Sequence, residues 1–320
     1  MKKLLLSLSI VAMLFSCQNE DSKQANSTTT SNLKRACATQ EVLERQLSED
    51  PELANKMNKI EEFTQKYIQK GDFNRLVNGK IQIPVVVNIL YKTAAENISQ
   101  AQIQSQIDVL NKDYTATNSD FNQVPALFSG VKANIGITFV LDQIIRKSTT
   151  KTSWGTADAM KKTSKGGIAP TSPTTKLNLW VCTIGGGILG YAQFPGGSSA
   201  TDGVAIDSKY FGLSGSANSP YNLGRTASHE VGHWMNLRHI WGDATCGSDL
   251  VSDTPTHDGA NFGVPAYPKY STCSGTPVEM TMNYMDYTDD NAMYMFTNGQ
   301  KDRMTAIFAI GGARNSFAQP

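Results

Sequence analysis

Residues 226–239 of the chain read TASHEVGHWMNLRH, and they hold three of the four histidines among its 320 residues. His229 and His233 are four positions apart, so in a helix both imidazoles project from one face and can bind the same metal ion. Glu230 is one residue round from His229, where its carboxylate can reach a water on that metal without being a ligand. The stretch therefore predicts a helix that carries half of a zinc site together with a general base.

The third predicted ligand is His239, which requires the helix to end soon after His233. The chain would turn at Asn236, because asparagine tolerates the left-handed conformation best after glycine. Three histidines leave one tetrahedral position of Zn²⁺ open, as in catalytic sites, whereas structural sites close it with another cysteine or histidine. We read His257, in a polar stretch, as a surface histidine and not as a ligand.

The composition is that of a folded protein. Hydrophobic residues make up 40% of the chain and charged residues 18%, which argues against disorder along its whole length. The formal net charge is +1, so no strong field attracts nucleic acid or an anionic membrane. We therefore expect no nucleic-acid partner.

The N-terminus predicts export. A basic start, Met1-Lys2-Lys3, precedes an apolar run over residues 4–15, which is typical of a signal peptide covering residues 1–16. The run ends in LFSC, residues 14–17, which resembles the lipobox of bacterial lipoproteins, so Cys17 would be lipidated. The alternative is a plain signal peptide. We expect an outer-membrane or cell-surface lipoprotein, or a protein secreted after release, with a lipid anchor as its only membrane contact.

Three regions follow the signal peptide. Residues 17–36 are largely polar and predict a lipidated tether. Residues 37–78 predict a pro-segment, with one or two amphipathic helices over residues 40–70. Residues 79–320 form the expected catalytic domain, with strands at 81–91, 135–141, 177–182 and 203–206 and a helix capped by Ser99. Strands mixed with helices in this order predict an α/β layer.

The chain has five cysteines, and setting Cys17 aside leaves an even number for an oxidising compartment. Cys246 and Cys273 are the preferred disulfide pair. They flank one stretch rich in glycine, proline and aspartate, which has few apolar residues to order it.

Several further motifs carry a family resemblance. The third histidine opens HIWGD (239–243), and DLVSDTP (249–255), NYMDY (283–287) and FTNGQ (296–300) follow it, while LGYAQFP (189–195) precedes it. With the histidine motif, these are similar to the metzincin clan of zinc peptidases and, within it, to the pappalysin family. The resemblance covers most of the chain from about Ile83 onward.

The resemblance implies an α/β (α+β) catalytic domain in two parts. A twisted mixed sheet and the zinc-binding helix would form the upper half, and mostly irregular chain from about Ile240 the lower half, with the cleft between them. Met285 would be the Met-turn residue, an apolar bed under the zinc, and Tyr287 would hydrogen-bond the oxyanion. The alternatives are a core methionine and a core tyrosine.

The resemblance also implies a Ca²⁺ site at Asp249, Asp253 and Thr254, whose oxygens suit a hard cation. The alternative is ordinary loop hydrogen bonding by these residue types. The Cys246–Cys273 pair carries over from the family, but Pro265 and Ala292 stand where some members have a second disulfide. Some members also have an acid near position 291 that selects a basic side chain after the scissile bond, and Asn291 lacks that charge.

Cys37 lies in KRACAT, residues 34–39, which resembles a short pro-segment motif whose thiolate occupies the open zinc position. A thiolate there would displace the catalytic water and keep the protein latent. The alternative is an unpaired or mixed-disulfide cysteine in the tether.

These features predict an exported zinc endopeptidase, made as a latent precursor, that acts on protein or peptide substrates. Two rival functions stay open. One is a surface lipoprotein that binds a partner and uses zinc only structurally, against which Glu230 argues. The other is a zinc hydrolase that cleaves a non-peptide amide. Activity tests with casein and with amidated cell-wall fragments would distinguish it from a peptidase.

Overall fold

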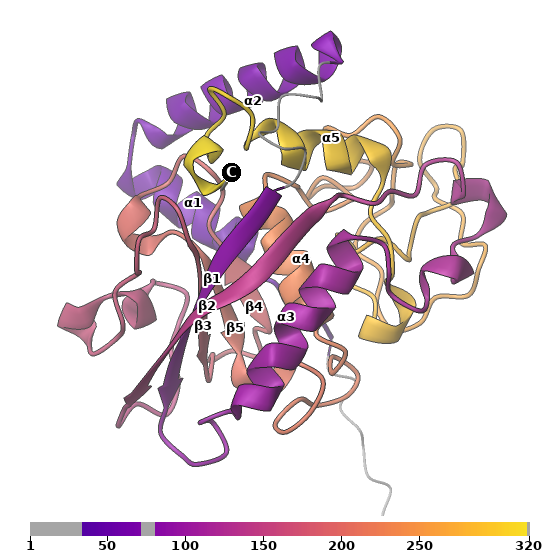
Figure 1. Ribbon diagram of the computed structural model, residues 1–320. Coiled ribbons are helices and arrows are strands. Elements are labelled where there is room, and N and C mark those ends of the chain that lie inside the picture. The colour runs from indigo at the N-terminus through magenta and orange to yellow at the C-terminus, as the bar shows by residue number, and fades with distance from the viewer. Residues whose placement is uncertain (1–33, 72–80, 319–320) are drawn as a thin grey trace, which may run out of the picture. The chain divides into compact units, whose positions relative to one another are not determined.

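The structure is a computed structural model that describes residues 34–71 and 81–318. The predicted signal peptide, the lipidation of Cys17, most of the tether and the end of the pro-segment lie outside the described residues. Helices and strands keep the labels of Figure 1 below.

A five-stranded mixed sheet forms the core, in the order β2-β1-β3-β5-β4. Four strands are parallel, namely β1 (Ile81–Tyr91), β2 (Ile137–Ser148), β3 (Leu177–Cys182) and β5 (Val204–Asp207), while β4 (Gly190–Ala192) is antiparallel to β5 and forms the edge. Strands β1 and β3 lie inside the sheet because both are mostly apolar, with β-branched residues dominating β1, and can be buried on both faces. The predictions for these two strands are confirmed.

Two helices pack together on one face of the sheet (Figure 1). α3 (Gln100–Tyr114) begins at Ser99, whose side chain accepts a hydrogen bond from the Gln102 amide, as the sequence predicted. α4 (Arg225–Trp234) carries the histidine motif and is buried along its whole length. Since α4 contacts both α3 and the strands β4 and β5, the histidines are held next to the edge of the sheet.

The chain beyond Ile240 is mostly irregular, as the family resemblance implied. Its one long regular element is α5 (Asn298–Ala306), which the sequence analysis did not predict. Thr297 and Gln300 form a reciprocal capping box at its start. Cys246 and Cys273 form the predicted disulfide. The short 3₁₀ helices of the described residues are Phe121–Gln123, Ala126–Phe128, Ala159–Lys161, Thr163–Lys165, Ser199–Thr201, Ser208–Tyr210, Asp290–Ala292 and Asn315–Phe317.

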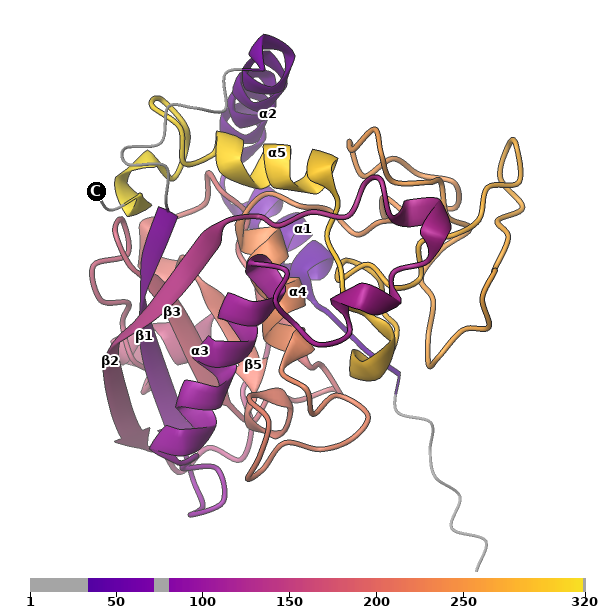
Figure 2. The same ribbon diagram turned by 45° about the vertical axis from the view of Figure 1, so that its right-hand side comes forward.

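The two helices predicted in the pro-segment are α1 (Thr39–Glu49) and α2 (Leu53–Lys70). Figures 1 and 2 show α2 beside α5, where Glu61 of α2 forms an ion pair of 2.9 Å with Arg303 of α5. α1 lies against β4, and its Arg45 pairs with Asp158 at 2.6 Å. Both helices are therefore docked on the rest of the protein through charged contacts.

None of the helices within residues 34–71 and 81–318 is long and apolar enough to cross a bilayer.

Candidate active site

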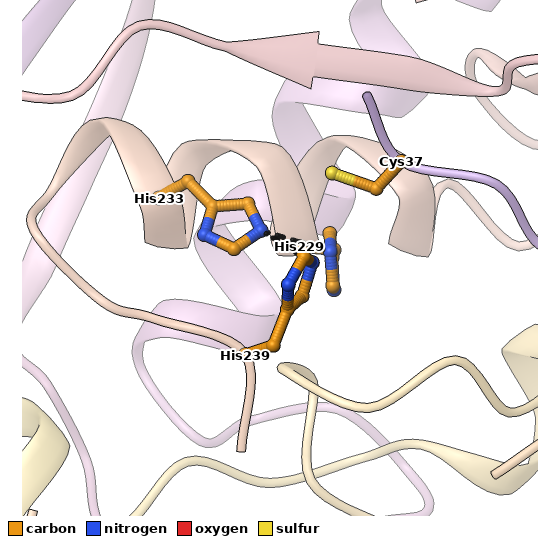
Figure 3. Close-up of side chains that lie close together, drawn as sticks. All are labelled: Cys37, His229, His233 and His239. Carbon is orange, nitrogen blue, oxygen red and sulfur yellow. Dashed lines mark hydrogen bonds between the residues drawn. The ribbon is translucent and has the colours of Figure 1, made fainter. Parts of the chain in front are cut away.

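Three imidazoles converge at the site, as Figure 3 shows. Nε2 of His233 lies 3.1 Å from Nε2 of His229 and 3.0 Å from Nε2 of His239. All three side chains are at most 2% exposed. The three predicted ligands thus meet at one point, although His239 lies beyond the end of the helix.

The protonation of these histidines points to a metal. Nδ1 of His229, His233 and His239 lies within 2.8 Å of the Tyr284 carbonyl, the Leu237 carbonyl and the Asp243 carboxylate respectively. Those oxygens can only accept, so each Nδ1 carries the proton and each Nε2 presents a lone pair. Burial also lowers the pKa of His233 to about 3, which keeps the ring neutral. Three facing lone pairs repel one another unless a cation lies between them, so the residues fit a zinc ion.

Asn236 makes the turn that brings His239 back. Its φ of 74° is left-handed, as the sequence predicted, and the helix ends just before it at Trp234. The Leu237 amide then bonds back to the Gly232 carbonyl at 3.0 Å. A β-branched residue at position 236 would be strained in this conformation.

Met285 lies directly beneath the zinc-binding helix. A Cβ added at Gly232 would stand 2.5 Å from its Sδ, so the helix approaches this methionine as closely as glycine permits. Met285 is fully buried, and its carbonyl accepts a hydrogen bond from Ile240 at 3.1 Å. This position under the helix is the one that the Met-turn prediction requires, and the role itself stays a prediction.

Cys37 completes the group of possible ligands. Its thiol and the three Nε2 atoms all lie within 4.8 Å of one another, and Figure 3 shows it facing the imidazoles. Burial, with the nearby Glu230, raises the pKa of the thiol well above its usual value. The backbone pairs in parallel with edge strand β4, through Ala38 N to Gly190 O at 3.1 Å and Leu189 N to Ala36 O at 2.8 Å.

Glu230 and Tyr287 flank the metal ligands, and both are engaged by the N-terminal segment. Glu230 Oε2 accepts hydrogen bonds from the Thr39 hydroxyl at 2.9 Å and the Cys37 thiol at 3.3 Å. Burial raises the pKa of Glu230 to about 7. Tyr287 packs edge-on against His239 and donates its hydroxyl to the Cys37 carbonyl at 3.2 Å. Cys37 and Thr39 thus occupy the space next to both Glu230 and Tyr287.

Arg35 is buried beside the start of α4, where its Nη1 donates to the Thr226 hydroxyl at 3.3 Å. Its Nη2 lies 2.5 Å from Asp290 Oδ1, its Nε donates to the Thr288 carbonyl at 3.1 Å, and its guanidinium lies 4.7 Å from the ring centre of Tyr221. Arg35 is 2% exposed and Asp290 is fully buried. The sequence analysis looked for an acid near position 291 and found Asn291, and Asp290, one residue earlier, is the acid that pairs with a basic side chain here. Arg35 was also assigned to the tether, yet it is docked here.

The residues predicted to bind Ca²⁺ do not all meet. Asp249 accepts hydrogen bonds from the Thr254 hydroxyl at 3.0 and 2.9 Å, while Asp253 accepts from the Thr297 hydroxyl and the Gly299 amide at 2.7 and 2.8 Å. Asp253 therefore bonds to the start of α5. Burial raises the pKa of Asp249 to about 6. Calcium binding stays a prediction.

The prediction for His257 is wrong, because this side chain is fully buried. Its Nε2 accepts a hydrogen bond from the Met280 amide at 2.9 Å, and Asp286 lies 3.7 Å from its Nδ1. These two partners are more than twenty positions along the chain, so a polar local sequence did not reveal them.

Residues 181–309 match the family described as Pregnancy-associated plasma protein-A. Extracellular metalloprotease 1 of Coccidioides posadasii is 33% identical over 246 residues, which are 71% of this chain and 78% of the relative. An extracellular metalloprotease of Pyricularia oryzae is 35% identical over 234 residues, covering 70% and 72%.

Two solved structures from Tannerella forsythia extend the comparison. Mature mirolysin in complex with a cleaved peptide is 43% identical, with a TM-score of 0.72, and covers 75% of this chain and 96% of that one. A promirolysin mutant is 39% identical, with a TM-score of 0.81, and covers 89% and 97%. Because the precursor form matches more of this chain than the mature form, the similarity extends into residues before the sheet.

The fold and the three-histidine site define a metallopeptidase of the metzincin clan. Within that clan, the chain belongs to the pappalysin family.

Proposed function

We propose that this chain is a zinc-dependent endopeptidase, made as a latent precursor, that cleaves peptide bonds preceding a basic side chain. One observation carries the proposal: three buried Nε2 lone pairs and Glu230 face a single point, which the chain's own residues 35–39 cover. The metal is assigned from the family and from the fit of the histidines.

Zinc bound by His229, His233 and His239 would lower the pKa of a water and polarise a peptide carbonyl. Glu230 lies next to the ligands, so its carboxylate accepts a proton from the attacking water and later returns it to the leaving amine. The Tyr287 hydroxyl, which now donates to a carbonyl of the N-terminal segment, would donate to the oxyanion of a substrate. Edge strand β4 holds the substrate backbone through the amide and carbonyl groups that now bond to Ala36 and Ala38.

The proposed latency follows from the positions that residues 35–39 occupy next to the histidines, Glu230 and Asp290. Cys37 faces the metal position, Thr39 bonds to Glu230, and Arg35 fills the pocket of Asp290. The pro-segment thus blocks the ligand position, the base and the specificity pocket together, and its docked part begins before Cys37.

The N-terminal sequence and the relatives named extracellular metalloproteases support export. Lipidation at Cys17 and a Ca²⁺ ion at the loop of Asp249 are parts of the proposal that rest on sequence motifs alone.

Removing the metal should abolish cleavage. After the pro-segment is cut off, the protein should cleave denatured casein, and a zinc chelator should stop the reaction until Zn²⁺ is restored. Zinc content measured by mass spectrometry should track activity at one ion per chain. If the protein binds zinc yet cuts nothing after pro-segment removal, the binding-lipoprotein function replaces this one.

Replacing Asp290 by asparagine should weaken cleavage before arginine by about a hundredfold, because an ion pair to a buried charge is worth roughly 2–5 kcal/mol. Cleavage before methionine should change far less. The measurement is kcat/KM on two peptides that differ only in the residue after the scissile bond. Asp142→Asn, at an exposed ion pair with Lys176, is the matched control. Equal losses on both peptides would count against a specificity role for Asp290.

A further inference from the structure

Asp290, the acid of the proposed specificity pocket, lies in a part of the chain with little regular secondary structure. Asp290 begins a 3₁₀ helix of three residues within the irregular lower half. One side-chain oxygen, Oδ1, contacts Arg35. The other, Oδ2, accepts hydrogen bonds from the amides of Leu223 at 2.8 Å and Arg225 at 3.3 Å. The carboxylate is therefore bound to the first turn of α4, the helix that carries the metal ligands.

The side chain of Arg225 holds the backbone around the same acid. Its Nη1 donates to the Asp290 carbonyl at 2.8 Å and to the Met293 carbonyl at 2.6 Å. These carbonyls lie on the two sides of the short helix Asp290–Ala292. Arg225 is 6% exposed, so these bonds are protected from competition with water.

Asp120 fixes the guanidinium from the other side. Its two oxygens lie 2.5 Å from Nη1 and 2.8 Å from Nη2 of Arg225, which is a bidentate pair. Asp120 is itself held by the Asn118 side chain at 2.7 Å. Asp113, at 3.7 Å, is the other acid facing Arg225, and it also accepts a bond from Ser228 of α4 at 2.6 Å. Arg225, Asp113 and Asn118 are buried, and the Asp120 side chain is 18% exposed, so most of this network is shielded from water.

We propose that Arg225, fixed by Asp120, is a positioning residue that sets where Asp290 meets a basic substrate side chain. Arg225 is the first residue of the zinc-binding helix, so one residue links the specificity pocket to the metal ligands. Neither Arg225 nor Asp120 touches Arg35, the side chain that now occupies the pocket. The inference rests on the proposed function, because it assumes that the pocket selects a basic residue of the substrate.

The physical reason is preorganisation. A carboxylate held by two amides on a fixed backbone loses little conformational freedom when it binds a guanidinium. If the backbone of Asp290 and Met293 is released, the same carboxylate must be ordered during binding, which weakens arginine recognition without altering the chemistry at the metal. A merely structural role for Arg225 would instead lower stability and affect all substrates alike.

The test uses two variants of the mature enzyme. Arg225→Lys keeps the positive charge but has no planar fork, so it cannot form the two-nitrogen pair with both Asp120 oxygens. Asp120→Asn keeps the shape and leaves Arg225 in place. Arg146→Lys is the control, since Arg146 bonds to Asn97 and Ile98, far along the chain from the pocket residues. Each is assayed on two peptides that differ only by arginine or methionine after the scissile bond, with zinc content and melting temperature measured.

We expect the preference for arginine over methionine to fall about tenfold in both variants, through a higher KM for the arginine peptide. The kcat values, the zinc content and the methionine peptide should be unaffected, and the control should match the wild type. An unchanged preference, or parallel losses on both peptides, would overturn the inference. If Arg225→Lys does not fold, Asp120→Asn decides alone. A wild-type enzyme without any preference for arginine would refute the proposed specificity first.

Discussion

Replacing Glu230 by glutamine should lower kcat for a peptide substrate by about a thousandfold, within the range for loss of a general acid and base. Glutamine has the same shape but cannot accept the proton of the attacking water. Because Glu230 is not a ligand, the zinc content should not change. The comparison is made after the same limited digestion of both proteins with an added protease, which is then inhibited, so that neither depends on its own activity to lose the pro-segment.

The matched control for this variant is Glu96→Gln. Glu96 also accepts several hydrogen bonds, from the amides of Lys92 and Thr93 and from the Thr183 hydroxyl, but it lies in a turn away from the histidines. Its replacement should leave kcat unchanged. If Glu230→Gln kept more than about a tenth of the activity with zinc bound, another residue would have to be the base.

Replacing Cys37 by alanine should activate the intact precursor by about a hundredfold. The binding free energy of a four-ligand zinc site, divided among its ligands, is about 3 kcal/mol for one thiolate. Since each 1.4 kcal/mol is a factor of ten, losing the thiolate raises the fraction of precursor with an accessible metal by about a hundredfold. Arg35 and Thr39 would still hold the segment, so activation should be incomplete. The readout is the initial rate on a short peptide, with the chain shown by gel to be uncut.

Cys182→Ala provides the comparison, because Cys182 is the other free cysteine among the described residues and lies buried in β3. It should leave the precursor latent. A Cys37→Ala precursor as inactive as the wild type would show that the thiol does not maintain latency.

The sequence predicted those parts of the fold that depend on residues close together in the chain. Strands β1 and β3 are confirmed residue for residue, because each is a mostly apolar run, and β1 is also rich in β-branched residues. The zinc-binding helix and the turn at Asn236 after its end are confirmed for a similar reason: the spacing of the histidines and the tolerance of asparagine for positive φ are local properties.

What the sequence did not predict depends on contacts between distant residues. β4 has three residues, too few to show a pattern, and it is a strand because β5 pairs with it. α5 has almost no apolar periodicity, and its capping box is its main local signal. Asp290, one position before Asn291, was not singled out, because its pairing with Arg35 depends on the path of irregular chain. The pairing of Arg35 with Asp290 joins residues 255 positions apart.

The charged contacts of the N-terminal segment are spread over the protein: Arg35 with Asp290, Arg45 with Asp158, and Glu61 with Arg303. A cut between α2 and β1 would leave these three ion pairs intact. Before the cut, the N-terminal segment is tethered and acts as an inhibitor at a high effective concentration. After the cut, it is a separate peptide that must dissociate before the site opens. Occupancy would then depend on the total protein concentration, so a cut sample would gain activity on dilution. Peptide-bond cleavage and the appearance of activity would be two events with two different rates.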